Sequence, residues 1–406
     1  MRAESAYGEV PMPNLDRLTA GGVRFTQCHT SHTTCSQSRA SFMTGWPTHV
    51  NGHRSLWSLV RDSEPNVFRY LHDDGYDVYW WGKNDNLEDT AMMHSTMHRE
   101  AGNGGDHNGT KLFAFGDPRY YSFLYPPLDA SHANKTQDWY NVNEAIEFLK
   151  KRTPSSPPFM IFLPLLLPHP PYSCPEPWHS MVDPATVQMH RPISTAADAK
   201  PDFHGYLRQF THQDQLNASE AELLYRQLFD IVATTLELAS IKPEHVHFSR
   251  SLMPYMSASA KPAGFTPRAF VYTEGGYATN EPRDHEGWDG LPDEKDDYYY
   301  KELLEQDLPI SVCRAVSVRN LTAKLVFRSD PKAPDHYSEL YDLVADPFEL
   351  SNKYADPAYA PLRAELKEEM LRWLVQTSDI TPWSVCDRNS GKCDKTPFRR
   401  RRRRRQ

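Results

Sequence analysis

The sequence predicts an α/β fold with a doubly wound, mostly parallel sheet flanked by helices, followed by a smaller C-terminal α+β subdomain. Three observations predict it. The chain has 406 residues, of which 39% are apolar, and is long enough for one large body and a smaller unit. Helical and strand patterns alternate through the first half. Short strands and one amphipathic helix follow towards the C-terminus.

Two helix-then-strand units open the chain. In the first, Pro13 is placed to begin a helix and Gly21-Gly22 to end it, and a strand is expected over Val23 to Cys28. In the second, Asn66 to Asp74 has a helical pattern, and the aromatic strand Tyr76 to Trp81 follows after a glycine. Repetition of this order favours parallel strands.

A third unit follows in the middle of the chain. One face of its helix is marked by five residues: Trp139, Val142, Ala145, Ile146 and Leu149. After Pro157-Pro158 comes the strand Phe159 to Leu163, whose continuous apolar character predicts burial. Ligands gather beyond the carboxyl ends of parallel strands. We therefore expect the binding edge in the loops after Cys28, Trp81 and Leu163.

The C-terminal part predicts a separate unit. Short strands are expected over Ala269 to Thr273 and Val312 to Arg328, and a helix over Leu228 to Ala239 precedes them. The closing helix carries four apolar residues on one side: Leu362, Leu366, Met370 and Trp373. The predicted division is a main domain over residues 1–255, an α+β subdomain over residues 262–385 and a disordered basic tail over residues 386–406.

Charge and composition exclude several classes of protein. The formal net charge is −8 despite seven consecutive arginines, Arg399 to Arg405, so the body is acidic and no specific nucleic-acid partner is expected. The longest apolar run, Phe159 to Leu167, contains Pro164, and no membrane span is expected. Six irregularly spaced cysteines predict no disulfide framework. The N-terminal residues lack an apolar leader, and the default expectation is a cytoplasmic location.

The densest group of polar residues lies between positions 26 and 53. It contains Cys28, His29, His32, Cys35, Arg39, His49 and His53. The first four could form a zinc site. Alternatively, Cys35 is a single reactive cysteine near a helix N-terminus with Arg39 four residues further on, an arrangement suited to binding an anion. An inert cysteine at a strand–helix junction is the third interpretation.

The segment Cys35 to Gly45 resembles the signature of the sulfatase family, in which Cys-x-Pro-x-Arg leads into Leu/Met-Thr-Gly. Four further blocks resemble the same family in the same order: Pro13 to Leu18 with Gly22 to Phe25, Gly75 to Val78 with Gly82-Lys83, Pro168 to Tyr172, and Glu339 to Leu343 with Asp346-Pro347. The resemblance covers most of the chain. It implies an alkaline-phosphatase-like fold, with residues 1–255 forming an incomplete sulfatase-like catalytic domain.

The resemblance also implies a chemistry. In the family, a formylglycine-generating enzyme oxidises the motif cysteine, and the hydrated formylglycine attacks the sulfur of a sulfate ester on a small molecule or a glycan. Cys35 would hold that position, and Arg39 would steady the nucleophile. Lys83 and His169 would neutralise the sulfate and protonate the leaving oxygen. His49 and His53 are candidates for binding the substrate.

The sequence departs from the family pattern at four places. Gln37 stands where the signature has proline, and Asp85 stands where Lys-x-His has its histidine. The family holds a divalent metal, usually calcium, between paired aspartates and a later Ser-Asp-His/Asn-Gly segment. Neither is found in Met1 to Val10 or before Leu228, and the nearest Asp-His pair is Asp284-His285. The metal ligands of this chain are therefore unknown from its sequence.

These observations predict a sulfuric ester hydrolase of the arylsulfatase type. Two alternatives stay open. One is a non-catalytic protein of the sulfatase fold that binds anionic ligands or a partner. The other is a phosphodiester or phosphonate ester hydrolase of the same superfamily, because sulfate and phosphate esters share tetrahedral geometry.

Overall fold

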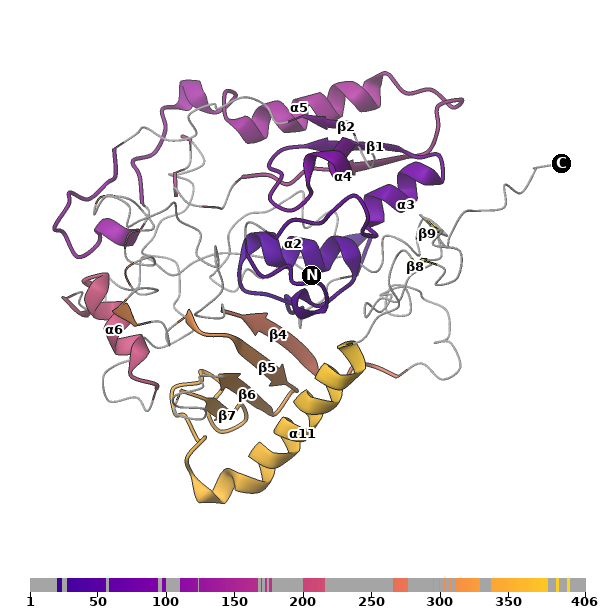
Figure 1. The fold of residues 1–406 in the computed structure, drawn as a ribbon. Coiled ribbons are helices and arrows are strands. Elements are labelled where there is room, and N and C mark those ends of the chain that lie inside the picture. The colour runs from indigo at the N-terminus through magenta and orange to yellow at the C-terminus, as the bar shows by residue number, and fades with distance from the viewer. Residues whose placement is uncertain are drawn as a thin grey trace.

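The computed structural model describes the following residues: 20–23, 28–55, 58–93, 97–99, 110–122, 124–166, 169, 172–173, 175–176, 200–215, 266–276, 295, 299, 303, 307–308, 312–328, 337–378, 385–386 and 393–394. They form two main bodies of secondary structure, each built around one sheet (Figure 1). The predicted helix over Leu228 to Ala239, Asp284-His285 and the arginine tail lie outside the described residues. So does most of the predicted strand Val23 to Cys28.

The first sheet is parallel and has the order β2-β1-β3. Its strands are β1 (Asp77–Trp81), β2 (Met97–Arg99) and β3 (Phe159–Phe162). Figure 1 shows α2 (Cys35–Thr44), α3 (Val67–Asp73) and α4 (Asp89–Met93) on one side of this sheet and α5 (Gln137–Lys150) on the other. Helices on both faces of a parallel sheet confirm the predicted α/β class.

Alternation along β1 directs side chains to both layers. Val78 and Trp80 join the core formed with α2, α3 and α4. Tyr79 and Trp81 instead face α5, where their rings lie 4.0 Å and 5.8 Å from the ring of Phe148. Because β1 is covered on both faces, its residues from Val78 to Trp81 are all large and apolar or aromatic.

The first core holds α2 against the sheet. Ala40 and Met43 of α2 pack with Phe68 and Leu71 of α3 and with Trp80 of β1. Complete burial of a side chain as large as Phe or Leu stabilises the fold by about 1.5–3 kcal/mol. Since α2 begins at Cys35, this core also fixes the position of the candidate nucleophile.

Local signals explain where α3 begins and ends and where α5 begins. The side chain of Asn66 accepts a hydrogen bond from the Arg69 amide at 2.8 Å, and Gly75 follows α3 with a left-handed φ of 91°. The hydroxyl of Thr136 accepts one from the Trp139 amide at the start of α5. The positions of both helices and of β1 were therefore predicted closely.

Two expectations about burial were wrong. Ala145 of α5 is buried, but Trp139, Ile146 and Leu149 are among the exposed apolar residues, because α5 packs through Ala145, Asn141 and Phe148 instead. The strand β3 is only partly buried, and Phe159 at its start is 43% exposed. For both α5 and β3, the apolar pattern of the sequence therefore predicted more burial than the structure shows.

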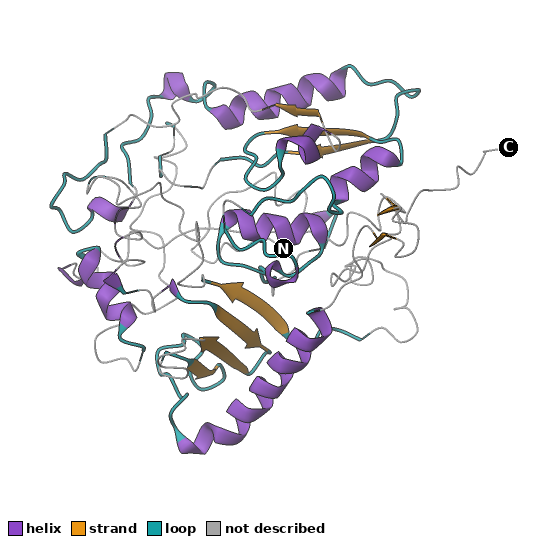
Figure 2. Cartoon of the chain, in the orientation of Figure 1, coloured by secondary structure: helices purple, strands orange, loops and turns teal. Residues whose placement is uncertain are grey.

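The second sheet is antiparallel and has the order β4-β5-β6-β7. Its strands are β4 (Val271–Gly275), β5 (Ala315–Arg319), β6 (Ala323–Arg328) and β7 (Glu339–Asp342). The long helix α11 (Ala360–Thr377) crosses one face (Figure 2), where Leu366 and Met370 pack on Val318, Leu325 and Leu340. This arrangement is the expected α+β unit, while its limits at residues 262 and 385 stay a prediction.

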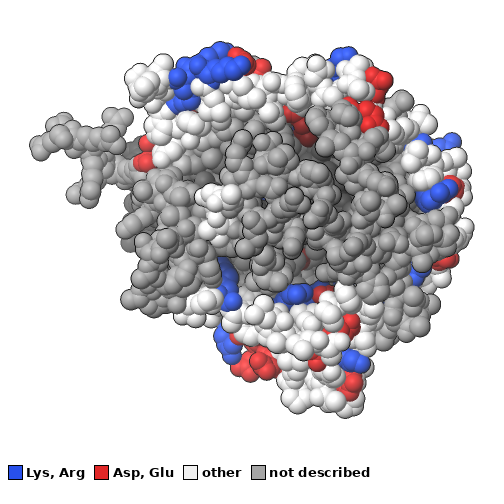
Figure 3. Space-filling view, turned by 180° about the vertical axis from the view of Figure 1, so that it is seen from behind, with Lys and Arg blue, Asp and Glu red and all other residues white. Residues whose placement is uncertain are grey.

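The remaining described elements are short. They are α6 (Phe203–Phe210), the strand pair β8 (Val385–Cys386) and β9 (Cys393–Asp394), and the 3₁₀ turns Thr48–Val50, Tyr120–Ser122, Ala130–His132, Gln213–Gln215 and Pro357–Tyr359. Within the described chain, none of the helices combines the length and apolar character needed to cross a bilayer. On the face seen in Figure 3, acidic side chains lie near basic ones in the described parts. Such mixing is typical of a solvated surface.

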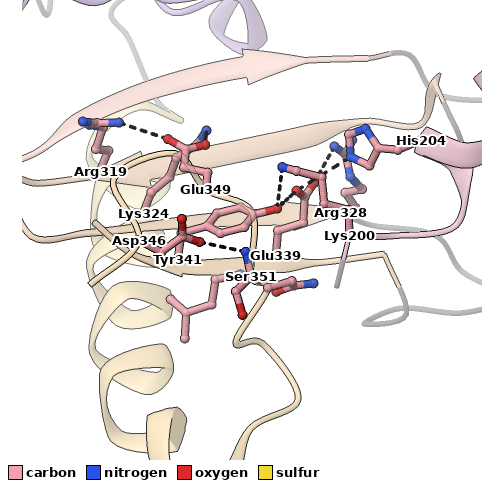
Figure 4. A network of polar contacts seen from close by, with 12 residues as sticks. Lys200, His204, Arg319, Lys324, Arg328, Glu339, Tyr341, Asp346, Glu349 and Ser351 are labelled. Carbon is pink, nitrogen blue, oxygen red and sulfur yellow. Dashed lines mark hydrogen bonds and ion pairs between the residues drawn. The ribbon is translucent and has the colours of Figure 1, made fainter. Parts of the chain in front are cut away.

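The face of the second sheet opposite α11 carries a polar network (Figure 4). Glu349 pairs with Arg319 at 3.2 Å and with Lys324 at 2.6 Å. Glu339, which is buried, pairs with Arg328 at 3.0 Å and accepts a hydrogen bond from the Tyr341 hydroxyl. These contacts connect β5, β6 and β7 on the side that α11 does not cover.

Glu339 is expected to make stability fall in acid. Burial alone would raise its pKa, but the neighbouring His204, Tyr341 and Arg328 outweigh burial and lower the pKa from 4.5 to about 2. A carboxyl whose pKa is lower in the folded state stabilises the protein above pH 4.5, and the contribution is lost as pH falls towards 2. The difference between the two pKa values corresponds to about 3 kcal/mol at most.

Urea unfolding at a series of pH values measures this effect. Glu339→Gln should unfold at lower urea than the wild type at about pH 7, with the difference shrinking towards about pH 3. Glu368→Gln is the control, because Glu368 pairs with Arg372 on the exposed surface of α11 and should contribute little. A difference at Glu339 that stays constant with pH would contradict the assignment.

Candidate active site

The helix α2 presents Cys35 at its first residue. The preceding Thr34 is extended, with φ −115° and ψ 156°, and its carbonyl accepts the Ser38 amide at 3.0 Å. At the other end, Gly45 adopts a left-handed φ of 73° and its amide bonds to the Ser41 carbonyl. Cys35 is partly exposed and lies at the positive end of the helix dipole, an environment that favours an anion.

The loop after β1 places Lys83 at the edge of the first sheet. Gly82 connects β1 to Lys83 with φ 126°. A Cβ at this position would lie 2.7 Å from the carbonyl oxygen of Pro164, in the loop after β3. Only glycine allows so close an approach, and the ends of the two neighbouring strands therefore meet at this point.

Asp85 brings the predicted cations together. Its Oδ1 lies 3.2 Å from Lys83 Nζ, and its Oδ2 lies 3.7 Å from Arg39 Nε. The backbone carbonyl of Asp85 also accepts a hydrogen bond from the hydroxyl of Ser36, next to Cys35. We refer to Arg39, Lys83 and Asp85 as the Asp85 cluster. It confirms that α2 and the loop after β1 lie together, but the sequence did not predict a carboxylate between the two cations.

Gln37 faces the interior behind Cys35. The side chain is fully buried, and its Nε2 donates to the carbonyl of Arg54 at 2.9 Å. Gln37 is the third residue of α2, where a backbone amide has no acceptor one turn earlier within the helix. Proline can occupy such a position without removing a helical hydrogen bond.

Gln37→Pro is expected to increase oxidation of Cys35 by a formylglycine-generating enzyme, because it restores the family's Cys-x-Pro-x-Arg pattern. Loss of the bond to Arg54 should destabilise the fold by about 1 kcal/mol. Peptide mass spectrometry after co-expression measures the aldehyde fraction. Gln37→Leu is the matched control, since it also removes the bond but adds no proline. Equal aldehyde in the two variants would contradict the expectation.

The structure places His49 between the two sheets. Its Nδ1 lies 2.6 Å from Glu274 Oε1, its Nε2 lies 2.9 Å from the hydroxyl of Thr377, and its ring meets that of Trp373 edge-on. Burial would raise the pKa of Glu274, but hydrogen bonds from His49 and Thr48 outweigh it and lower the pKa. Both ring nitrogens of His49 are engaged in holding α11 and β4, so we leave it out of the site proposed below.

His53 is also in a structural position. It is 2% exposed, its Nδ1 lies 2.7 Å from the Ser58 carbonyl, and its Nε2 lies 3.3 Å from Glu64 Oε2. A residue enclosed in this way cannot reach a substrate without opening the core. We therefore leave His53 out of the proposed site as well.

His169 lies in the loop after β3 and is partly exposed. Its backbone amide donates to the carbonyl of Leu166 at 2.7 Å, and the Leu166 amide bonds to Asp138 on α5. Because β3 is parallel to β1, this loop leaves the sheet at the same edge as the loop that carries Lys83. The role of His169 as a proton donor stays a prediction.

The described residues do not supply a metal centre. Among them, His, Cys, Asp and Glu side chains nowhere gather in a group of three or more that could hold an ion. The zinc interpretation of Cys28, His29, His32 and Cys35 is therefore wrong for this structure. His32, for example, is buried, with its Nδ1 2.8 Å from the Thr34 hydroxyl. The described residues offer no ligand set for the family's metal, and no step proposed below passes through one.

The strand β4 supports the segment that leads to Cys35. The amide of Glu274 donates to the carbonyl of Ser31 at 2.8 Å, and the hydroxyl of Thr273 donates to that of Thr30 at 2.7 Å. Glu274 thus contacts both the segment before α2 and His49 after it. Sequence reasoning missed this residue, because a single glutamate at the end of a strand carries no local signal.

Comparison with known proteins decides the family. The family model described as Sulfatase matches residues 3–217, which is more than half of the chain. The chain belongs to the sulfatase family. The relatives found carry the names of sulfatases as well.

Relatives of this sulfatase-family chain include two mouse proteins. It is 28% identical to arylsulfatase K of Mus musculus over 167 residues, which are 40% of this chain and 28% of that protein. It is 25% identical to iduronate 2-sulfatase of Mus musculus over 183 residues, which are 42% of this chain and 33% of that protein. The matched region thus spans a third or less of each of these two relatives.

Solved structures confirm the fold. The phosphonate monoester hydrolase of Silicibacter pomeroyi superposes with a TM-score of 0.65 at 16% identity, over 95% of this chain and 94% of that one. Likeness at this identity establishes the alkaline-phosphatase-like fold predicted from the sequence. Both sulfatases and phosphonate hydrolases occur among the structural neighbours.

Proposed function

We propose that the chain is a sulfuric ester hydrolase whose nucleophile derives from Cys35. The observation that carries this proposal is the Asp85 cluster, which places Arg39 and Lys83 beside the first turn of α2, where Cys35 begins the helix. Two cations at the helix that begins with the partly exposed Cys35 suit an anionic ester.

Each of these residues has a part in the proposed reaction. A formylglycine-generating enzyme would oxidise Cys35 to an aldehyde, and one hydroxyl of the aldehyde hydrate attacks the sulfur while the ester oxygen leaves as an alcohol. The second hydroxyl then expels the sulfate by C–O cleavage and restores the aldehyde. Arg39 and Lys83 attract the sulfate oxygens and stabilise the charge that builds up on them. His169 is proposed to give the departing oxygen its proton, from the loop at the same edge of the sheet.

The proposed substrate is a sulfate ester carried by a small molecule or by a glycan, and the proposed maturation partner is a formylglycine-generating enzyme. Family membership and the sulfate-ester relatives support this class of substrate. Calcium, or another divalent metal, would depend on ligands outside the described residues.

The test compares chain produced with and without a formylglycine-generating enzyme. The substrate is an aryl sulfate, 4-nitrophenyl sulfate, and release of inorganic sulfate is measured. We expect release only from the co-expressed protein. Equal release from both preparations would contradict the proposed nucleophile, and binding of the ester without any release would favour the non-catalytic alternative.

A further inference from the structure

We propose that Asp85 makes the anion site selective for singly charged tetrahedral esters and against doubly charged phosphate monoesters. Sulfate monoesters, phosphonate monoesters and phosphate diesters each carry one negative charge, whereas a phosphate monoester carries two at neutral pH. The inference rests on the proposed function, because it assigns the charge of the substrate that the same site accepts.

The net charge of the Asp85 cluster is the first argument. Arg39 and Lys83 each contribute one positive charge, and Asp85, which lies between them, contributes one negative charge. The three side chains therefore present a single net positive charge, which one negative charge on a ligand balances. A second negative charge would face the Asp85 carboxylate without a further cation from the cluster.

Partial burial strengthens the effect of the Asp85 carboxylate on a bound ligand. The side chain of Asp85 is only 10% exposed, compared with 25% for Arg39 and 34% for Lys83. The two cations can thus reach a ligand from solvent, while the carboxylate stays behind them. Charges in such partly buried surroundings interact several times more strongly than in bulk water.

The Asp85 oxygen that faces Arg39, Oδ2, accepts no hydrogen bond from the described residues. Asp85 Oδ2 is buried and accepts none within the described chain, since Arg39 Nε at 3.7 Å is an ion pair beyond hydrogen-bond distance. Arg39 therefore has donors left for a ligand, while the Asp85 charge acts on it through space.

The loop that holds Asp85 does not depend on its carboxylate. The Asn84 side chain bonds to both backbone groups of Leu87, at 2.8 Å and 3.1 Å, and the Val60 amide donates to the Asn86 carbonyl at 2.7 Å. Ser36 bonds to the Asp85 backbone rather than to its side chain. Asp85→Asn should therefore change the charge and leave the loop in place.

The experiment measures binding to the Cys35→Ala chain, which cannot turn over its ligands. Three probes share a nitrophenyl group: 4-nitrophenyl sulfate, 4-nitrophenyl phenylphosphonate and 4-nitrophenyl phosphate. Calorimetry is performed at about pH 8, above the second pKa of a phosphate monoester, which is about 6. The Cys35→Ala chain should bind the two singly charged probes at least as tightly as the phosphate.

Two variants then change the net charge of the Asp85 cluster, one making it more positive and the other less positive. Asp85→Asn should raise the affinity for the phosphate, relative to the sulfate, by about tenfold, and Lys83→Gln should lower that ratio. Asp89→Asn is the matched control, because it makes the same change of charge at an exposed residue of α4 nearby and should leave the ratio unchanged. Thermal unfolding of each variant checks that it is folded.

The outcomes separate this inference from the proposed function. Tight binding of all three probes with a ratio that Asp85→Asn does not change would overturn the charge selection and leave the hydrolase proposal standing. A ratio that Asp89→Asn shifts as much as Asp85→Asn would also overturn it, as an effect of overall charge. Failure to bind any probe would overturn both proposals.

Discussion

Replacing Cys35 by alanine is expected to abolish sulfate release from an aryl sulfate. Alanine removes the sulfur that oxidation converts to the nucleophile, and the neighbouring hydroxyl, that of Ser36, is buried and donates to the Asp85 carbonyl. Loss of a catalytic nucleophile commonly costs about 10³-fold or more in turnover. The fold should survive, because Cys35 is at the helix end and is not part of the first core. Sulfate release and thermal unfolding should be measured on the same preparation.

Cys28→Ala is the matched control for Cys35→Ala. Cys28 lies seven positions earlier in the chain and is exposed to solvent. Its replacement should leave sulfate release close to that of the wild type. If Cys35→Ala released sulfate at the wild-type rate, Cys35 would be removed from the mechanism. Loss of release in both variants would point to a general effect of the thiols instead.

Replacing Gly82 by alanine is expected to give the largest loss of stability among small changes near the site. The left-handed φ of 126° is unfavourable for alanine, at about 1–2 kcal/mol. The new methyl group would also lie 2.7 Å from the Pro164 carbonyl oxygen, and relieving such overpacking costs about 1–3 kcal/mol more. Urea unfolding should show both contributions together. Since Gly82 precedes Lys83, the same change should displace the Asp85 cluster and lower sulfate release.

Gly52 separates the two contributions. It has a left-handed φ of 79°, but a Cβ there would have no neighbouring atom within 4 Å. Gly52→Ala should therefore show only the backbone cost of about 1–2 kcal/mol. If the two variants lost equal stability, the close approach of Gly82 to Pro164 would not contribute to the fold.

The sequence predicted the helix and strand order where local signals agree with tertiary packing. Gly75 marks the end of α3, and the aromatic run that follows is β1. The amphipathic pattern of Leu366 and Met370 predicted the buried side of α11 correctly. The same kind of pattern failed for α5, because Phe148 packs on Tyr79 while Trp139 stays exposed. Periodicity identifies an apolar face, but the partner that covers it depends on the fold.

The candidate site was predicted in part for a similar reason. Cys35, Arg39 and Lys83 were suggested by the resemblance to the sulfatase family, and the structure brings α2 and the loop after β1 together. The carboxylate of Asp85 between the two cations was not expected. Likewise, Glu274 lies 225 positions after His49, and their contact depends on how the second sheet meets the first. Such long-range pairs leave no pattern in a single sequence.

The central claim is that Cys35 is the source of the catalytic nucleophile, and peptide mass spectrometry across Cys35 tests it most directly. The chain is expressed beside a formylglycine-generating enzyme, digested, and treated with an aldehyde-specific tag, because the hydrated aldehyde has nearly the mass of the thiol. We predict a tagged peptide whose untagged, dehydrated form is about 18 Da lighter than the cysteine peptide. A peptide that keeps an unmodified Cys35 thiol under these conditions would contradict the claim.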